Sequence, residues 1–75
     1  MKLYYFYDQR ADVFYFSEGK PSAKSISQET SDDVILRLDR KTGRVKGFTV
    51  LNFSKRLKSK SQPIELPIIA KLTPA

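Results

Sequence analysis

Three aspartates stand at positions where paired carboxylates could do chemistry. Asp8, Asp12 and Asp39 adjoin runs of apolar residues, near the predicted ends of strands. Two carboxylates can act as general acid and base or hold Mg²⁺, but such sites need burial, a like-charge neighbour or a cavity that fixes the ligands. The sequence indicates none of these. Aspartates beside turns commonly accept hydrogen bonds from the backbone, so we expect a structural role for all three.

The chain lacks most of the side chains that nucleophilic catalysis requires. It contains eight serines but neither histidine nor cysteine, so a serine lacks its usual base and the commoner zinc ligands are missing. A Ser–Lys pair is the arrangement that remains, and 75 residues leave little room for an enclosing cleft. We therefore predict no catalytic activity, no metal and no cofactor.

Positive charge gathers towards the C-terminal end. Residues 1–54 carry nine basic and seven acidic side chains, whereas residues 55–75 carry five basic and one acidic, within a net charge of +6. A basic groove with stacking rings is how proteins hold single-stranded nucleic acid. A solvated, solubilising end is the simpler interpretation. Nucleic-acid binding is thus our alternative function, with these candidate residues: Lys55, Arg56, Lys58 and Lys60.

The elements that must position these residues begin with two aromatic segments. Residues 2–7 and 12–16 are predicted strands joined by a short polar connection, as in a hairpin. Successive side chains of a strand point to opposite faces, so rings occupy both faces here. One face can build the core, and the other needs a further surface. The first sixteen residues contain seven of the nine aromatic residues: Tyr4, Tyr5, Phe6, Tyr7, Phe14, Tyr15 and Phe16.

The remaining chain predicts one more hairpin and little else. Residues 34–39 and 44–53 alternate as strands around a turn, and Gly47 marks a possible bulge. Residues 23–28 form a weak edge-strand pattern. Ser54 can cap a short helix over 55–60. Pro63 and Pro67 confine the following apolar segment to an edge strand or an extended arm.

These elements together predict a mainly β fold. We expect a small twisted antiparallel sheet of two hairpins plus one or two edge strands, with at most one short helix near residues 54–60. Residues 1–62 form the single domain, and residues 63–75 form a C-terminal extended segment or edge strand. A core of this size rarely supplies more than about 3–5 kcal/mol, and without cysteine, self-association is the remaining means of stabilisation.

The two hairpins carry a set of residues in a defined order and spacing: Tyr7-Asp8-x-x-Ala11-Asp12-x-x-Tyr15, Val34-Ile35-Leu36, Asp39, Gly43, Val45, Gly47 and Ser54-Lys55-Arg56-Leu57. This pattern resembles a small bacterial family catalogued as domain of unknown function 2283. The resemblance spans about residues 1–57 and implies a compact, mostly β domain without established biochemical activity. Members of that family are often encoded beside small toxin-like proteins. Arg37, Thr49 and Asn52 stand where the family is usually acidic, so we expect no role based on an acidic face.

The function that these observations predict is protein binding without catalysis. We expect a homodimer and, from the resemblance, an antitoxin-like partner of a small toxin-like protein. We expect a cytoplasmic protein with no membrane partner, because cysteine is absent and no apolar run approaches the length of a membrane span. The candidate interface lies on the surplus hairpin face and on the C-terminal segment, which would dock as an added strand. Its residues are Tyr4, Phe6, Phe14 and Phe16, and then Ile64, Leu66 and Ile68.

Overall fold

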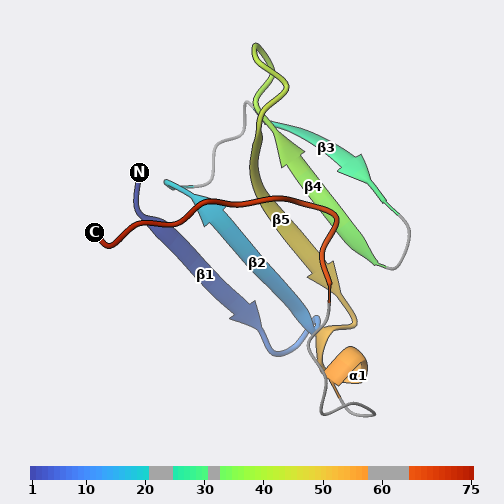
Figure 1. The fold of residues 1–75 in the computed structure, drawn as a ribbon. Coiled ribbons are helices and arrows are strands. Elements are labelled where there is room, and N and C mark those ends of the chain that lie inside the picture. The colour runs from blue at the N-terminus through green and yellow to red at the C-terminus, as the bar shows by residue number, and fades with distance from the viewer. Residues whose placement is uncertain (21–24, 31–32, 58–64) are drawn as a thin grey trace.

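One antiparallel sheet forms the centre of the molecule (Figure 1). The computed structural model describes residues 1–20, 25–30, 33–57 and 65–75. Its strands lie in the order β1-β2-β5-β4-β3, so β1 and β3 are the two edges of an open sheet. The predicted mostly β fold is thus confirmed. The elements are β1 (Leu3–Asp8), β2 (Val13–Glu18), β3 (Ile26–Glu29), β4 (Val34–Leu38), β5 (Val45–Leu51) and α1 (Phe53–Leu57).

Both predicted hairpins are present, and a non-local pairing joins them. β1 pairs with β2, and β4 pairs with β5, in each case antiparallel. The last strand of the second hairpin then lies beside the last strand of the first, with Phe16 opposite Phe48. The weakly predicted edge strand is β3, which pairs with β4. The first part of that prediction, at positions 23 and 24, lies outside the described residues.

A bulge in β5 lies beside Gly47, where the sequence pattern predicted one. Arg37 is opposite Gly47, but Leu38 is opposite Val45, so Lys46 is the additional residue. With regular pairing and no bulge, Lys46 would lie opposite Leu38 and Val45 would point to the other face of the sheet. The bulge instead allows Val45 to pack with Leu38 against the core.

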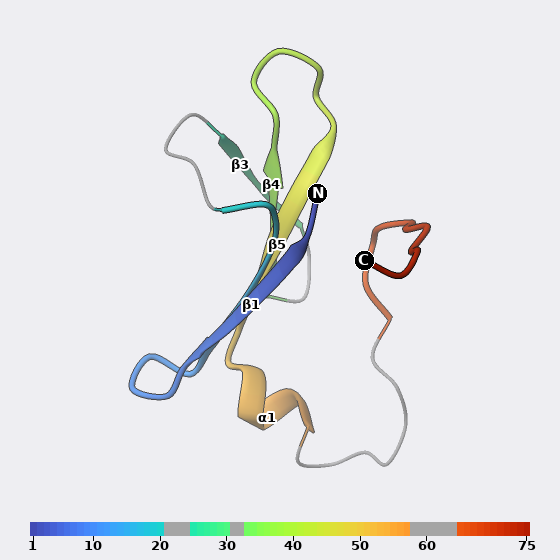
Figure 2. The ribbon, with the colours of Figure 1, turned by 90° about the vertical axis from the view of Figure 1, so that its left-hand side faces the viewer.

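The core lies on one face of the sheet, here called the core face, which carries Phe14 and Phe16. Figure 2 shows α1 and the C-terminal segment on this same side. The opposite face, here called the open face, carries Tyr4 and Phe6 and is covered by no helix or strand of the described residues. The buried core residues are Val34, Leu36, Phe48 and Val50, and against them pack Phe14, Phe16, Leu38, Val45, Phe53, Leu66 and Ile68.

The helix and the C-terminal segment differ in detail from the sequence prediction. α1 begins at Phe53, so Ser54 lies inside the helix rather than capping it, and residues 58–60 of the predicted helix lie outside the described residues. Asn52, at φ 52°, turns the chain from β5 into α1. Residues 65–75 run across the core face without strand structure. Within the described ranges, no helix has the length and apolar character needed to cross a bilayer.

Candidate functional site

Every residue of β1 from Leu3 to Tyr7 is exposed. The exposed fraction is 77% for Tyr5 and 63% for Phe6, and it is 44% for Tyr4 and 36% for Tyr7. These side chains alternate between the two faces of the sheet, so ring surface meets solvent on both. β1 is therefore an edge strand whose side chains its own sheet leaves largely uncovered.

The backbone of β1 also presents hydrogen-bonding groups to solvent. The Gly19 N–H donates to the Lys2 carbonyl at 2.8 Å, and these residues lie opposite one another by extension of the β1–β2 register. In an antiparallel pair such hydrogen-bonded positions recur at every second residue. The even-numbered residues thus bond to β2. The N–H and C=O groups of Leu3, Tyr5 and Tyr7 consequently point to the free edge of the sheet.

The four predicted aromatic interface residues do not share a face. Tyr5 lies opposite Phe16, and Tyr7 lies opposite Phe14, which places Phe14 and Phe16 on the core face. Phe16 stacks on Phe48 with ring centroids 5.0 Å apart. The grouping of all four on one surface was therefore wrong. Tyr4 and Phe6 remain on the open face, where Phe6 stacks on Tyr15 at 6.2 Å.

Sequence reasoning omitted Tyr5, the most exposed ring of β1. The signal that identifies it is the position of β1 at the edge of the sheet, because an edge strand lacks a neighbour on one side. That position depends on the pairing of β2 with β5. Alternation within one hairpin does not reveal it.

Two of the three predicted interface residues of the C-terminal segment pack within the chain. Leu66 and Ile68 contact the core, and Ile64 lies outside the described residues. The segment crosses the sheet face instead of adding a strand at an edge (Figure 1). Its exposed apolar side chains are Ile69 and Leu72.

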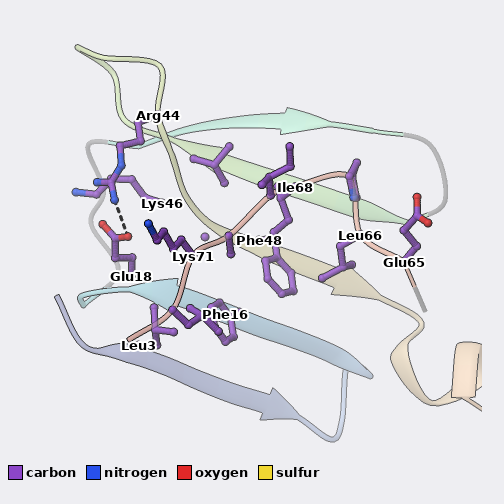
Figure 3. Close-up of a pocket in the computed structure, with 16 residues that line it drawn as sticks. Leu3, Phe16, Glu18, Arg44, Lys46, Phe48, Glu65, Leu66, Ile68 and Lys71 are labelled. Carbon is purple, nitrogen blue, oxygen red and sulfur yellow. Dashed lines mark hydrogen bonds and ion pairs between the residues drawn. The ribbon is translucent and has the colours of Figure 1, made fainter. Parts of the chain in front are cut away.

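A groove of about 1310 Å³ lies between this segment and the core face (Figure 3). Phe16, Phe48 and Ile68 contribute apolar side chains to it. Arg44 forms an ion pair with Glu18 at 2.8 Å, at the end of the groove where β5 begins. One wall of the groove is the core face and the other is the C-terminal segment of the same chain. This segment therefore already covers part of the core face.

A hydrogen-bonded cluster around Asp12 joins β1, the β1–β2 turn and α1. The Tyr7 hydroxyl donates to Asp12 Oδ1 at 2.6 Å. The Ser54 N–H donates to Oδ1 at 2.9 Å, and the Ser54 hydroxyl donates to Oδ2 at 2.8 Å. These bonds hold the pKa of Asp12 below its ordinary value, and the bond from Tyr7 has the largest effect. The same bond raises the pKa of Tyr7. The carboxylate takes the capping role at the start of α1 that the sequence assigned to Ser54.

Asp8 and Asp39 accept backbone hydrogen bonds in turns, as the sequence predicted. Asp8 Oδ1 accepts from the N–H groups of Arg10 and Ala11 at 3.0 and 3.1 Å. Asp39 Oδ1 accepts from the N–H groups that follow it, at 2.8 and 3.0 Å, and these bonds lower the pKa of Asp39. Asp39 lies in the β4–β5 turn, which is at the opposite end of the sheet from the β1–β2 turn, so the three carboxylates do not converge. No metal-binding group of three acidic, histidine or cysteine side chains occurs in the described part of the chain.

The basic cluster of the alternative function lies only partly within the described residues. Lys55 is exposed on α1, and Arg56 is partly buried, whereas Lys58 and Lys60 lie outside the described ranges. Tyr7 and Phe53 have ring centroids 5.5 Å apart, so α1 lies beside the end of β1. The helix that carries Lys55 and Arg56 therefore adjoins the ring of Tyr7.

The geometry defines a small open antiparallel β domain with an uncovered aromatic edge strand. A family described as "Protein of unknown function (DUF2283)" matches residues 5–54. That range is 50 of the 75 residues, and the chain belongs to this family. The matched range contains Tyr7, Asp12 and Ser54, the three residues of the hydrogen-bonded cluster. No curated protein and no solved structure matches the chain.

Proposed function

We propose that this chain is a non-catalytic protein-binding module that binds its partner through β1. One observation carries the proposal: five consecutive residues of an edge strand are exposed, and four of them are aromatic. Tyrosine and phenylalanine are enriched in protein interfaces. An extended partner segment added at this edge would hydrogen-bond the free backbone groups and cover the rings.

The edge of β1 lacks the usual protection against strand addition. Natural proteins shield such edges with charged residues, prolines, bulges or very short strands. Between Lys2 and Asp8 there is neither charge nor proline, and the six residues of β1 pair with β2 without a bulge. A strand of this kind is suited to binding.

The carboxylates support a role without catalysis. Asp8 and Asp39 each bond two backbone N–H groups of a turn, and Asp12 bonds Tyr7 and Ser54. These structural bonds occupy the groups that acid–base chemistry would use. The resemblance to the family supplies the class of partner: a small toxin-like protein, which this chain would bind and occlude in the manner of an antitoxin.

The experiment is a binding measurement with proline at the outward amide of Tyr5. Purification from the native host in mild salt provides the partner, and isothermal titration compares the wild type with Tyr5→Pro. The variant removes a ring and an N–H that points away from β2, so the fold tolerates it. We expect binding to weaken roughly tenfold or more.

Ser27→Pro provides the matched control on the other edge of the sheet. The Thr30 N–H donates to the Val34 carbonyl at 2.9 Å, so by alternation the Ser27 N–H points away from β4. This variant should bind as the wild type does. Equal binding by Tyr5→Pro and the wild type would contradict the proposal.

Nucleic-acid binding is separated from this proposal by its response to salt. Four to five phosphate contacts give a slope of about −3 to −4 in a log–log plot of the binding constant against salt for single strands. Oligonucleotide binding with that slope, unaffected by Tyr5→Pro, would replace protein binding as the function. A protein complex that is insensitive to salt supports the proposal.

A further inference from the structure

We propose that β1 pairs with the β1 strand of a second copy of this chain, antiparallel and centred on Tyr5. This inference rests on the proposed function, because it takes β1 as the binding strand: a second copy pairs with this edge in the chain alone, and a toxin-like partner binds the same edge in its place. A two-fold axis through Tyr5, perpendicular to the sheet, joins the two five-stranded sheets edge to edge. Hydrogen bonds, charge and ring positions each favour this register.

Hydrogen bonding limits how a second β1 can align. The outward N–H and C=O groups belong to Leu3, Tyr5 and Tyr7. In an antiparallel pair two opposed residues exchange both hydrogen bonds, so an odd-numbered residue must face an odd-numbered one. The register centred on Tyr5 meets this condition three times: Tyr5 faces its own counterpart, and Leu3 and Tyr7 face each other twice. All outward groups of Leu3, Tyr5 and Tyr7 are then bonded.

Charge selects this register from those that hydrogen bonding allows. With Tyr5 at the centre, Lys2 of each copy lies opposite Asp8 of the other. Neither charge has an ion-pair partner within the described residues, and Lys2 is exposed. The neighbouring allowed register on one side places Lys2 opposite Phe6, and the one on the other side places Asp8 opposite Tyr4. Only the register centred on Tyr5 opposes opposite charges at both ends.

The rings of the open face also meet in this register. Tyr4 lies opposite Phe6 of the second copy at a non-hydrogen-bonded position, where cross-strand side chains are closest. Phe6 already stacks on Tyr15, so the pairing extends one row of rings across both copies. On the core face Tyr5, the most exposed of these rings, meets its counterpart.

The test uses cysteine as a marker of register, because the chain contains none. The variants Tyr4→Cys, Tyr5→Cys and Phe6→Cys are each oxidised mildly and run on non-reducing gels. At a two-fold hydrogen-bonded position the two Cα atoms lie about 5.5 Å apart, which suits a disulfide. A residue one position away from the axis lies about 8 Å from its counterpart, which exceeds the disulfide range.

We expect Tyr5→Cys to form the linked dimer and the other two variants to remain largely unlinked. Preferential linking at position 4 or 6 would overturn the register. A chain that remains monomeric at every concentration in sedimentation and links at none of the three positions would overturn the second copy as partner. If Tyr5→Pro still weakened the binding of another protein in that case, the proposed function would stand without this inference.

A charge variant provides a second measurement. Lys2→Glu places two carboxylates together at each end of the pair, so we expect dimer affinity to fall about tenfold. Asp8→Asn removes the opposing charge and keeps an oxygen for the turn bonds to Arg10 and Ala11. In that background Lys2→Glu should have little effect. An equal effect of Lys2→Glu in both backgrounds would overturn the pairing of these two residues.

Discussion

Gly47→Ala tests how closely β2 and β5 approach at the centre of the sheet. Gly47 lies opposite Ser17 and Arg37, and a Cβ built on it falls well inside contact distance of the Phe16 carbonyl oxygen. A Cβ atom built on Gly47 would also lie 3.1 Å from Ser17 Cα. All of these are main-chain atoms, so no side-chain rotation relieves the clash. The two strands must separate for alanine to fit.

The expected loss follows from the known cost of overpacking. Forcing an added methyl group into a packed site costs typically about 1–3 kcal/mol. Replacing glycine with alanine also stabilises a protein by about 0.4–1 kcal/mol, because it lowers the conformational entropy of the unfolded chain. Because the clash is with main-chain atoms that cannot rotate away, we expect the overpacking cost to be near the upper end of this range. The net loss in the free energy of unfolding is then about 2 kcal/mol. A domain of this size has about 3–5 kcal/mol in total.

Urea unfolding followed by circular dichroism measures this loss, and the melting temperature should fall by about 8–16 °C. Gly43→Asn is the control. Gly43 has φ +73° and open space around its Cβ position, and asparagine tolerates that backbone conformation. Its stability should stay within about 0.5 kcal/mol of the wild type. A Gly47→Ala variant with the wild-type midpoint would refute the close approach of β2 and β5.

Three further predictions concern the cluster around Asp12 and the C-terminal segment. The pKa values of Asp12 and Asp39 are lowered in the folded chain, so the two ionised carboxylates stabilise the fold at pH above the ordinary aspartate pKa of about 3.9. This contribution to the free energy of unfolding should disappear as the pH falls through the lowered pKa values. Urea midpoints that stay constant into acid would contradict this. The pKa of Tyr7 is raised, so its contribution is complete below the ordinary tyrosine pKa of about 10 and is lost as pH rises through the raised value. Tyr7→Phe should abolish that alkaline loss in thermal melts, and an unchanged alkaline profile would argue against the hydrogen bond to Asp12. Ile68→Ala should cost about 1 kcal/mol because Ile68 is half-buried against the core, whereas Ile69→Ala, at a fully exposed neighbour, should cost almost nothing in the same urea titration. Equal losses for the two variants would mean that the segment does not pack on the core face.

The hairpins were predictable because alternation with a period of two is a local property of the chain. The residues around Leu36 alternate clearly, those around Phe14 form a continuous aromatic run typical of a strand, and the observed hairpin strands differ from the predicted ones by at most two residues at either end. The bulge beside Gly47 was also predictable, because the apolar positions change parity there. Each of these features depends on neighbours in sequence.

The choice of core face was not predictable from the first hairpin. Both of its faces carry rings, and the pairing of Phe14 and Phe16 with Val50 and Phe48 decides which face is buried. That pairing joins segments more than thirty residues apart. Alternation therefore separated Tyr4 and Phe6 from Tyr5 correctly but could not decide which of the two faces builds the core.

The hydrogen-bonded cluster was hidden for a similar reason. Asp12 has φ 58°, a left-handed conformation that aspartate tolerates, and it bonds Ser54 across a separation of 42 residues. The sequence pattern contained Tyr7, Asp12 and Ser54 but gave no sign that they meet. Ser54 therefore suggested a helix cap, whereas the carboxylate of Asp12 takes that role.

Amide hydrogen exchange of β1 tests its role as the binding strand most directly. The N–H groups of Leu3, Tyr5 and Tyr7 point to the free edge, whereas those of Tyr4 and Phe6 already bond to β2. Comparison of the monomeric chain, diluted below the concentration at which it pairs with a second copy, with its complex should show new protection at positions 3, 5 and 7 and little change at 4 and 6. Unchanged exchange at the odd positions in a formed complex would contradict binding through this edge.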